Sequence, residues 1–121
     1  MKIPGPDHPI AVTPTSEHVR VTFNGKVVAD TRHALVLCES TYKPVFYIPR
    51  EDAQMAMFER TANATHCAYK GDASYYSIRV GDRVAENAIW SYETPFPATA
   101  EIAGRLAFYP SRVDAIEVEP A

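Results

Sequence analysis

The sequence predicts a single, mainly β domain, either a small, strongly curled barrel or a sandwich, with one short helix. Apolar and polar residues alternate in "HVRVTF" (18–23), which is the pattern of a strand with one buried face. Asn24-Gly25 follows directly and is the strongest short hairpin signal, because both residues tolerate the positive φ of a tight turn. A second glycine turn, Gly81-Asp82, divides another long run of strand-forming residues. These observations favour strands over most of the chain.

The remaining strands are bounded by turn residues and prolines. Pro44 and Pro49 lack the N–H needed for a strand ladder and therefore mark strand ends. The expected strands are a return strand from Val27, "ALVLCES" (34–40), "KPVFYIP" (43–49), the two arms of a hairpin within 75–92, "RLAFYP" (105–110) and "VDAIEVE" (113–119).

The best helix candidate is "PREDAQMAMFERT" (49–61). Pro49 suits a first helical turn, and Glu51 and Asp52 would place negative charge near the positive end of the helix dipole. Met55 and Phe58 would form an apolar edge against the sheet. The segment 96–104 is at best a second short helix, ended by its glycine.

A chain of 121 residues has the size of one domain. Residues 1–17 are rich in Pro, Thr and Ser and predict an extended N-terminal arm, and residues 18–121 predict the mainly β domain. "NGKVVADT" (24–31) resembles "VGDRVAEN" (80–87), which suggests two related hairpin halves. However, the apolar alternation is out of phase between the two, which would bury opposite faces.

Composition argues against several classes of partner. The net charge is −3 and the basic residues are scattered, so we expect no nucleic-acid partner. No apolar run approaches a membrane span, so we expect no membrane partner. The N-terminus has no apolar signal-peptide core, which favours a cytoplasmic protein whose Cys38 and Cys67 are not bridged. The cysteines and histidines show no metal-ligand spacing, so we expect no metal and no cofactor.

Several longer segments are similar to a known family. "VVADTRHALVL", "PVFYIPREDA", "THCAYKGDASYYSI", "AENAIWSYETP" and "GRLAFYPSRVDA" together resemble domain-of-unknown-function family 427 over about residues 18–115. Some catalogues label this family nucleotidyltransferase-like. The resemblance implies a mainly β fold with little helix and a biochemical role that is not established. Ala68 replaces the proline usual in the family's "CPYKG", which implies a less rigid loop.

The segment "THCAYKGDASYY" (65–76) holds the candidate catalytic residues. Cys67 could act as a nucleophile if His66 or Lys70 stabilised its thiolate, and the alternative is a small buried cysteine. Lys70 precedes Gly71, the reverse of a phosphate-binding P-loop, so the alternative for Lys70 is a solvated residue beside a turn glycine.

Seven tyrosines and one tryptophan predict a concave, polar and aromatic pocket, because a tyrosine hydroxyl must find a partner or stay wet. Cross-strand aromatic pairing on the sheet faces is the alternative. An exposed Lys70 at the pocket mouth would favour an anionic group. The predicted ligand-binding residues are Glu39, Tyr47, Arg50, His66, Tyr69, Tyr75, Trp90 and Tyr92.

Three functions remain open on these grounds. The first is binding of a small molecule, neutral or anionic, in a cleft lined by tyrosine and tryptophan. The second is an enzyme that acts on a phosphorylated or nucleotide substrate through Cys67 or Lys70. The third is a β module for protein–protein contacts. The oligomeric state is not indicated by the sequence.

Overall fold

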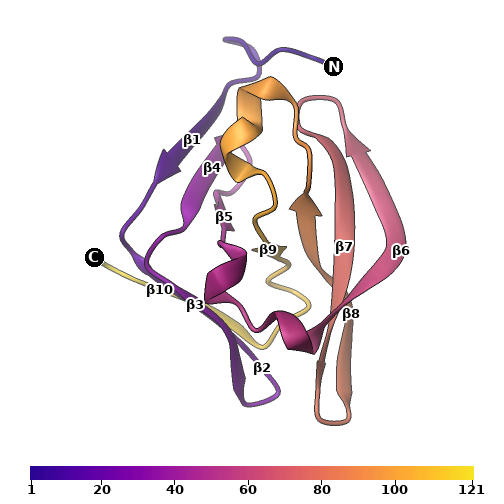
Figure 1. The fold of residues 1–121 in the computed structure, drawn as a ribbon. Coiled ribbons are helices and arrows are strands. Elements are labelled where there is room, and N and C mark those ends of the chain that lie inside the picture. Colours follow the sequence, from indigo (N-terminus) through magenta and orange to yellow (C-terminus); the bar gives the residue numbers. More distant parts are fainter.

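The computed structural model describes all residues, 1–121, and contains ten strands with only three short 3₁₀ segments. The strands form three antiparallel sheets, which together make a small sandwich-like fold and not a closed barrel. In Figure 1 the strands of the first half of the chain lie on the left, and the sheet formed mostly from the second half lies on the right. The mainly β class predicted from the sequence is confirmed.

The first two sheets use the N-terminal half and the C-terminal strand. One sheet has the order β1-β4-β5, with β1 at Ile10–Pro14, β4 at Leu35–Glu39 and β5 at Val45–Tyr47. The other has the order β10-β2-β3, with β10 at Ala115–Glu119, β2 at His18–Phe23 and β3 at Lys26–Thr31. Part of the expected N-terminal arm is therefore a strand of the first sheet, because Ile10–Pro14 pairs with β4.

The third sheet has the order β6-β7-β8-β9, with β6 at Phe58–Cys67, β7 at Gly71–Val80, β8 at Arg83–Tyr92 and β9 at Ala107–Phe108. Both predicted hairpins form at their glycine turns, where φ is +76° at Gly25 and +62° at Gly81. The hairpin tips are joined, since Asn24 Nδ2 donates to the Val80 carbonyl at 2.9 Å. The two tips also point the same way in Figure 1.

The predicted helix at 49–61 is wrong. Residues Arg50–Asp52 (η1) and Met55–Met57 (η2) form two separate 3₁₀ turns, and the chain then enters β6. Pro49 and the acidic residues start a turn as expected, but Gln54 N donates to the Val28 carbonyl and Ala53 bridges Ala29. These bonds to β3 replace the hydrogen bonds that a continuous helix would need. The short segment near 96–104 does form, as the 3₁₀ helix η3 at Pro97–Ile102.

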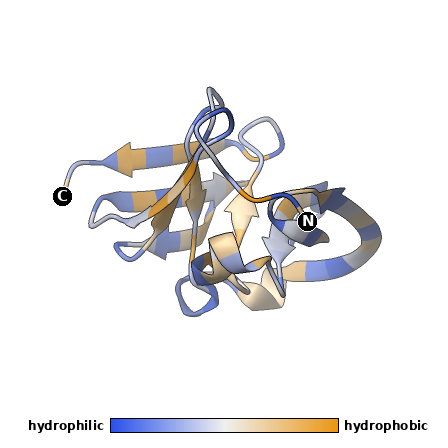
Figure 2. Ribbon diagram, turned by 90° about the horizontal axis from the view of Figure 1, so that it is seen from above, coloured by the Kyte–Doolittle hydropathy of each residue, from blue (hydrophilic) through white to orange (hydrophobic).

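Two apolar clusters fill the space between the sheets. The larger joins β2 and β3 to β7, β8 and β9, and includes Val19, Phe23, Ile78 and Ile89. The smaller joins β4 and β5 to β7 and β8 and is rich in tyrosine. Strands with one face on these clusters show alternating hydrophobic and hydrophilic bands in Figure 2, most clearly in the C-terminal strand. The predicted site residues gather beside the smaller cluster.

Candidate functional site

A pocket of about 180 Å³ opens on the tyrosine-rich cluster. It lies where β4 and β5 face β7 and β8, so that side chains from both sides of the sandwich converge on it. Its lining residues are Leu37, Glu39, Tyr42, Lys43, Val45, Tyr47, Lys70, Tyr75, Trp90, Tyr92 and Tyr109. Six of the predicted site residues, Glu39, Tyr47, Lys70, Tyr75, Trp90 and Tyr92, are therefore brought together.

Strand pairing explains why the aromatic rings converge. Tyr75 lies directly opposite Trp90 in the β7–β8 ladder, so both side chains project from the same face of the sheet. Tyr92 follows Trp90 by two residues and shares that face by the alternation of a strand. Tyr47 reaches the pocket from β5 and packs edge-to-face on Trp90, with ring centroids 6.4 Å apart. Tertiary packing of the two layers thus builds a pocket with aromatic walls.

Lys70 is buried in this pocket and is not at its mouth. Its side chain is 10% exposed, and its ammonium group pairs with the Glu39 carboxylate. Glu39 accepts a second hydrogen bond from His8 Nε2 at 2.9 Å, so each of its carboxylate oxygens has a donor. Burial alone would raise the pKa of Glu39, but the bonds from Lys70 and His8 outweigh it and hold the pKa below its usual value. The expectation of an exposed Lys70 is therefore wrong.

The tyrosine hydroxyls differ in whether they have a hydrogen-bond partner on the protein. Tyr75 Oη is within hydrogen-bond distance of Thr65 Oγ1 at 3.0 Å and of Tyr109 Oη at 3.2 Å. Tyr47 Oη accepts a bond from Trp90 Nε1 at 3.2 Å, which leaves its own proton without an acceptor on the protein. Tyr92 Oη has no partner on the protein and is not among the fully buried polar atoms, so it keeps some accessible area, and Tyr92 lines the pocket. Burial raises the pKa of Tyr47 and of Tyr92, which keeps both hydroxyls neutral hydrogen-bond donors.

A second, larger space adjoins this pocket. An apolar cleft of about 440 Å³ lies between the β10-β2-β3 sheet and the segment through β5, β8 and β9. Its lining residues are Val19, Val21, Lys43, Pro44, Val45, Phe46, Ile48, Trp90, Phe108, Pro110 and Ile116. Lys43, Val45 and Trp90 line both the cleft and the tyrosine pocket, so the two spaces adjoin at these three residues.

Comparison with known families now bears on this geometry. A family model described as a domain of unknown function (DUF427) matches residues 11–119. The chain belongs to that family. No curated protein matches the chain.

The DUF427 description carries no activity, so the chemistry must be argued from the site itself. All five segments through which the sequence resembles this family contribute to the pocket lining: Leu37, Val45, Tyr47, Lys70, Tyr75, Trp90, Tyr92 and Tyr109. Arg50, from the segment "YIPRED", does not. Its guanidinium binds both carboxylate oxygens of Glu93, at 2.8 and 2.9 Å. This member of DUF427 therefore uses Arg50 to tie η1 to the end of β8.

Three further predicted residues also lie outside the pocket. His66 is exposed on β6 and pairs with Asp72, its neighbour in the β6–β7 ladder, at 2.7 Å. Cys67 points to the other side of the strand, packs against the tyrosine-rich cluster and makes no hydrogen bond. Tyr69 stacks on His8, with ring centroids 4.1 Å apart, instead of entering the pocket. The segment 65–72 thus contributes one pocket residue, Lys70.

Several lining residues were missed by the sequence reasoning, above all Lys43 and Val45. Lys43 occupies the loop between β4 and β5, where the sequence analysis expected the first residue of a strand. Val45 is an ordinary strand residue with no distinguishing pattern. Pocket lining of this kind depends on the facing sheet and leaves no local signal in the sequence.

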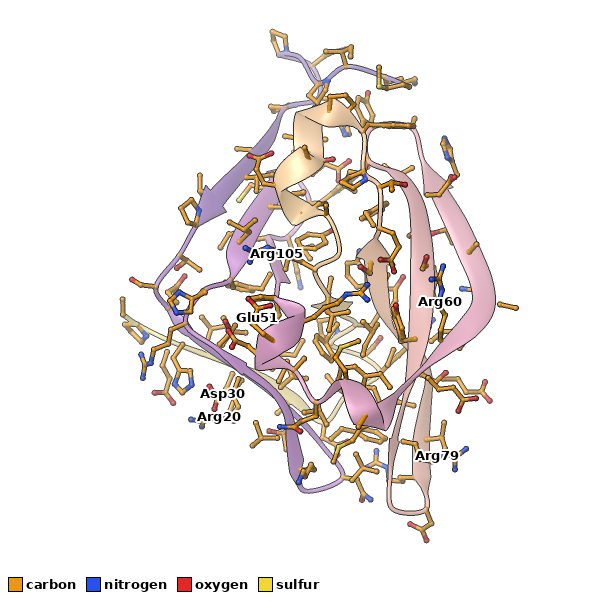
Figure 3. All side chains as sticks on the ribbon, viewed as in Figure 1. Arg20, Asp30, Glu51, Arg60, Arg79 and Arg105 are labelled. Atoms are coloured by element: carbon orange, nitrogen blue, oxygen red, sulfur yellow. The ribbon has the colours of Figure 1, made fainter.

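The outer face of the third sheet carries an open hollow of a different character. Arg60 and Arg79, labelled in Figure 3, line it together with Glu59 and Glu86. The mixed charges make this a solvated surface rather than a site for one kind of ion. No three His, Cys, Asp or Glu side chains gather into a metal-binding group. No helix is long and apolar enough to cross a membrane.

Proposed function

We propose that the protein binds a small, largely apolar molecule in the apolar cleft, with a polar end directed to the tyrosine pocket. The observation that carries this proposal is the contact between the two spaces at Trp90. Ligand pockets commonly have volumes of roughly 300–1,000 Å³ and apolar walls with a few fixed polar groups. The cleft, at about 440 Å³, falls within that range.

The polar end would find its partners in the tyrosine pocket. The hydroxyls of Tyr47 and Tyr92 each have a proton that no protein acceptor uses. A pocket of about 180 Å³ is too small for a complete ligand of ordinary size but fits one polar group. The proposal therefore assigns the apolar body to the cleft and the hydrogen-bonding group to the tyrosines.

An enzyme that uses Cys67 or Lys70 is less well supported. A nucleophilic thiol needs a base or cation nearby, and His66 is directed away from Cys67 toward Asp72. Lys70 donates to Glu39 and is not free to act on a phosphate. A cytoplasmic setting, in which Cys38 and Cys67 remain thiols, is part of the proposal and rests on cysteine usage.

Trp90 is the single tryptophan of the chain, so its fluorescence reports directly on the proposed site. A library of small apolar compounds should contain members that shift or quench this fluorescence saturably, and native mass spectrometry should detect the same complexes. Ile116→Phe, which adds bulk to the cleft wall, should weaken that binding severalfold. Val118→Phe is the matched control, because Val118 lies two residues along β10 and lines neither space. Binding that is unchanged in Ile116→Phe would contradict the proposal.

A further inference from the structure

We infer that the ligand of the cleft carries one anionic group, of the carboxylate or sulfonate kind, and that Lys43 binds it. This inference rests on the proposed function and adds the chemical class of the ligand. It makes the occupant an apolar acid rather than a neutral apolar molecule.

Lys43 is the single charged residue among those that line the apolar cleft. It forms no ion pair with any acidic side chain of the protein, and no acidic residue lines the cleft. A lysine stem can lie along apolar surface while its ammonium group stays at the rim. The cleft is therefore an apolar space with one uncompensated positive charge at its edge.

The tyrosine pocket also carries one excess positive charge, although a carboxylate lines it. Its carboxylate, Glu39, is shared between Lys70 and His8, so the Glu39–Lys70 pair contributes no net charge. Lys43, which also lines this pocket, again remains as the unpaired cation. An anionic group placed where the two spaces adjoin would lie near Lys43 and could accept a hydrogen bond from the Tyr47 or Tyr92 hydroxyl.

The position of Lys43 is restrained by its sequence neighbour. Pro44 follows it, and a residue before proline is confined largely to extended backbone conformations. Val45 then begins β5, which pairs with β4, so the chain is anchored immediately beyond the loop. The backbone of Lys43 is therefore more restrained than that of a residue at a free loop tip.

The test compares two fluorescent probes that differ by one anionic group, anilinonaphthalene sulfonate and its uncharged parent, anilinonaphthalene. Both are titrated into the folded protein while Trp90 quenching is followed. The sulfonate should bind about fivefold more tightly than the parent, and raised salt should reduce this difference because the charge lies at an exposed rim. Lys43→Gln should remove the fivefold advantage, because only the sulfonate loses a charged partner.

Two variants control this comparison. Lys43→Arg keeps the charge and should retain the preference for the sulfonate. Lys26→Gln removes an exposed lysine that lines neither space and should change nothing. Equal affinity of the two probes for the native protein, or an equal loss of both in Lys43→Gln, would overturn the inference while leaving the proposed function intact. If neither probe quenches Trp90, the proposed function fails as well.

Discussion

Replacing Lys70 by methionine tests whether the buried Lys70–Glu39 pair is part of the architecture. Removal of one partner of a buried ion pair typically costs about 3–5 kcal/mol, because the other charge is left uncompensated. Here Glu39 would keep its bond to His8 and would face the pocket, where water can enter. We therefore expect a loss of about 2–3 kcal/mol in the free energy of unfolding, which is about 10 °C in Tm for a domain of this size.

Urea and thermal unfolding of four variants, Lys70→Met, Glu39→Gln, their combination and Lys26→Met, would measure this effect. Lys26→Met, the same change at an exposed position, should alter stability by less than about 0.5 kcal/mol. The double variant Lys70→Met with Glu39→Gln should be more stable than the sum of the single losses predicts, because no buried charge is left alone. A loss of under about 0.5 kcal/mol in the free energy of unfolding of Lys70→Met would refute this reasoning and would indicate that the pair is solvated.

The pH dependence of the free energy of unfolding tests the role of Glu39 independently. The folded pKa of Glu39 is lowered, so its contribution to stability is present above the unfolded value of 4.5 and is lost as pH falls below it. In Lys70→Met the fall in stability below pH 4.5 should be shallower than in the native protein, because the carboxylate has lost one of its stabilising donors.

Four other outcomes follow from the structure. Phe58 is half-buried and edge-to-face with Phe108, so Phe58→Ala should cost about 2 kcal/mol in urea unfolding, less than the full-burial value. Gly25→Ala should cost about 1 kcal/mol at a φ of +76°, with Gly5→Ala as a neutral comparison. Stability should fall above pH 10.0, because the folded pKa of Tyr47 is raised and its phenolate forms more readily in the unfolded chain. Phenolate absorbance during alkaline unfolding would show this. Chelators should leave Tm unchanged, whereas stoichiometric zinc in the purified protein would contradict this prediction.

Local patterns in the sequence were sufficient for most of the strands and for both glycine turns, but not for β1 or β6. Alternation in 18–23 reports a half-buried strand, and Asn24-Gly25 accepts the backbone angles of its turn; both depend on interactions between near neighbours. The failed helix at 49–61 shows the limit of this reasoning. Its starting signals were real, but contacts with β3, distant in sequence, follow the first 3₁₀ turn directly. After the second turn, Phe58 pairs with Ile78 of β7 and the chain continues as a strand.

The sequence by itself determined the class of fold, the hairpins and the aromatic composition of the pocket, because these follow from side-chain periodicity and residue type. Tertiary structure alone decided which charges are free. Lys70 looked exposed beside its glycine, yet β4 brings Glu39 to it, whereas Lys43 has no acidic neighbour and remains unpaired. Neighbours that are 31 residues apart, as Glu39 and Lys70 are, leave no local signal. The distinction matters because a cation that is neutralised inside the protein stabilises the fold, and one that is left unpaired at a cleft can select a ligand.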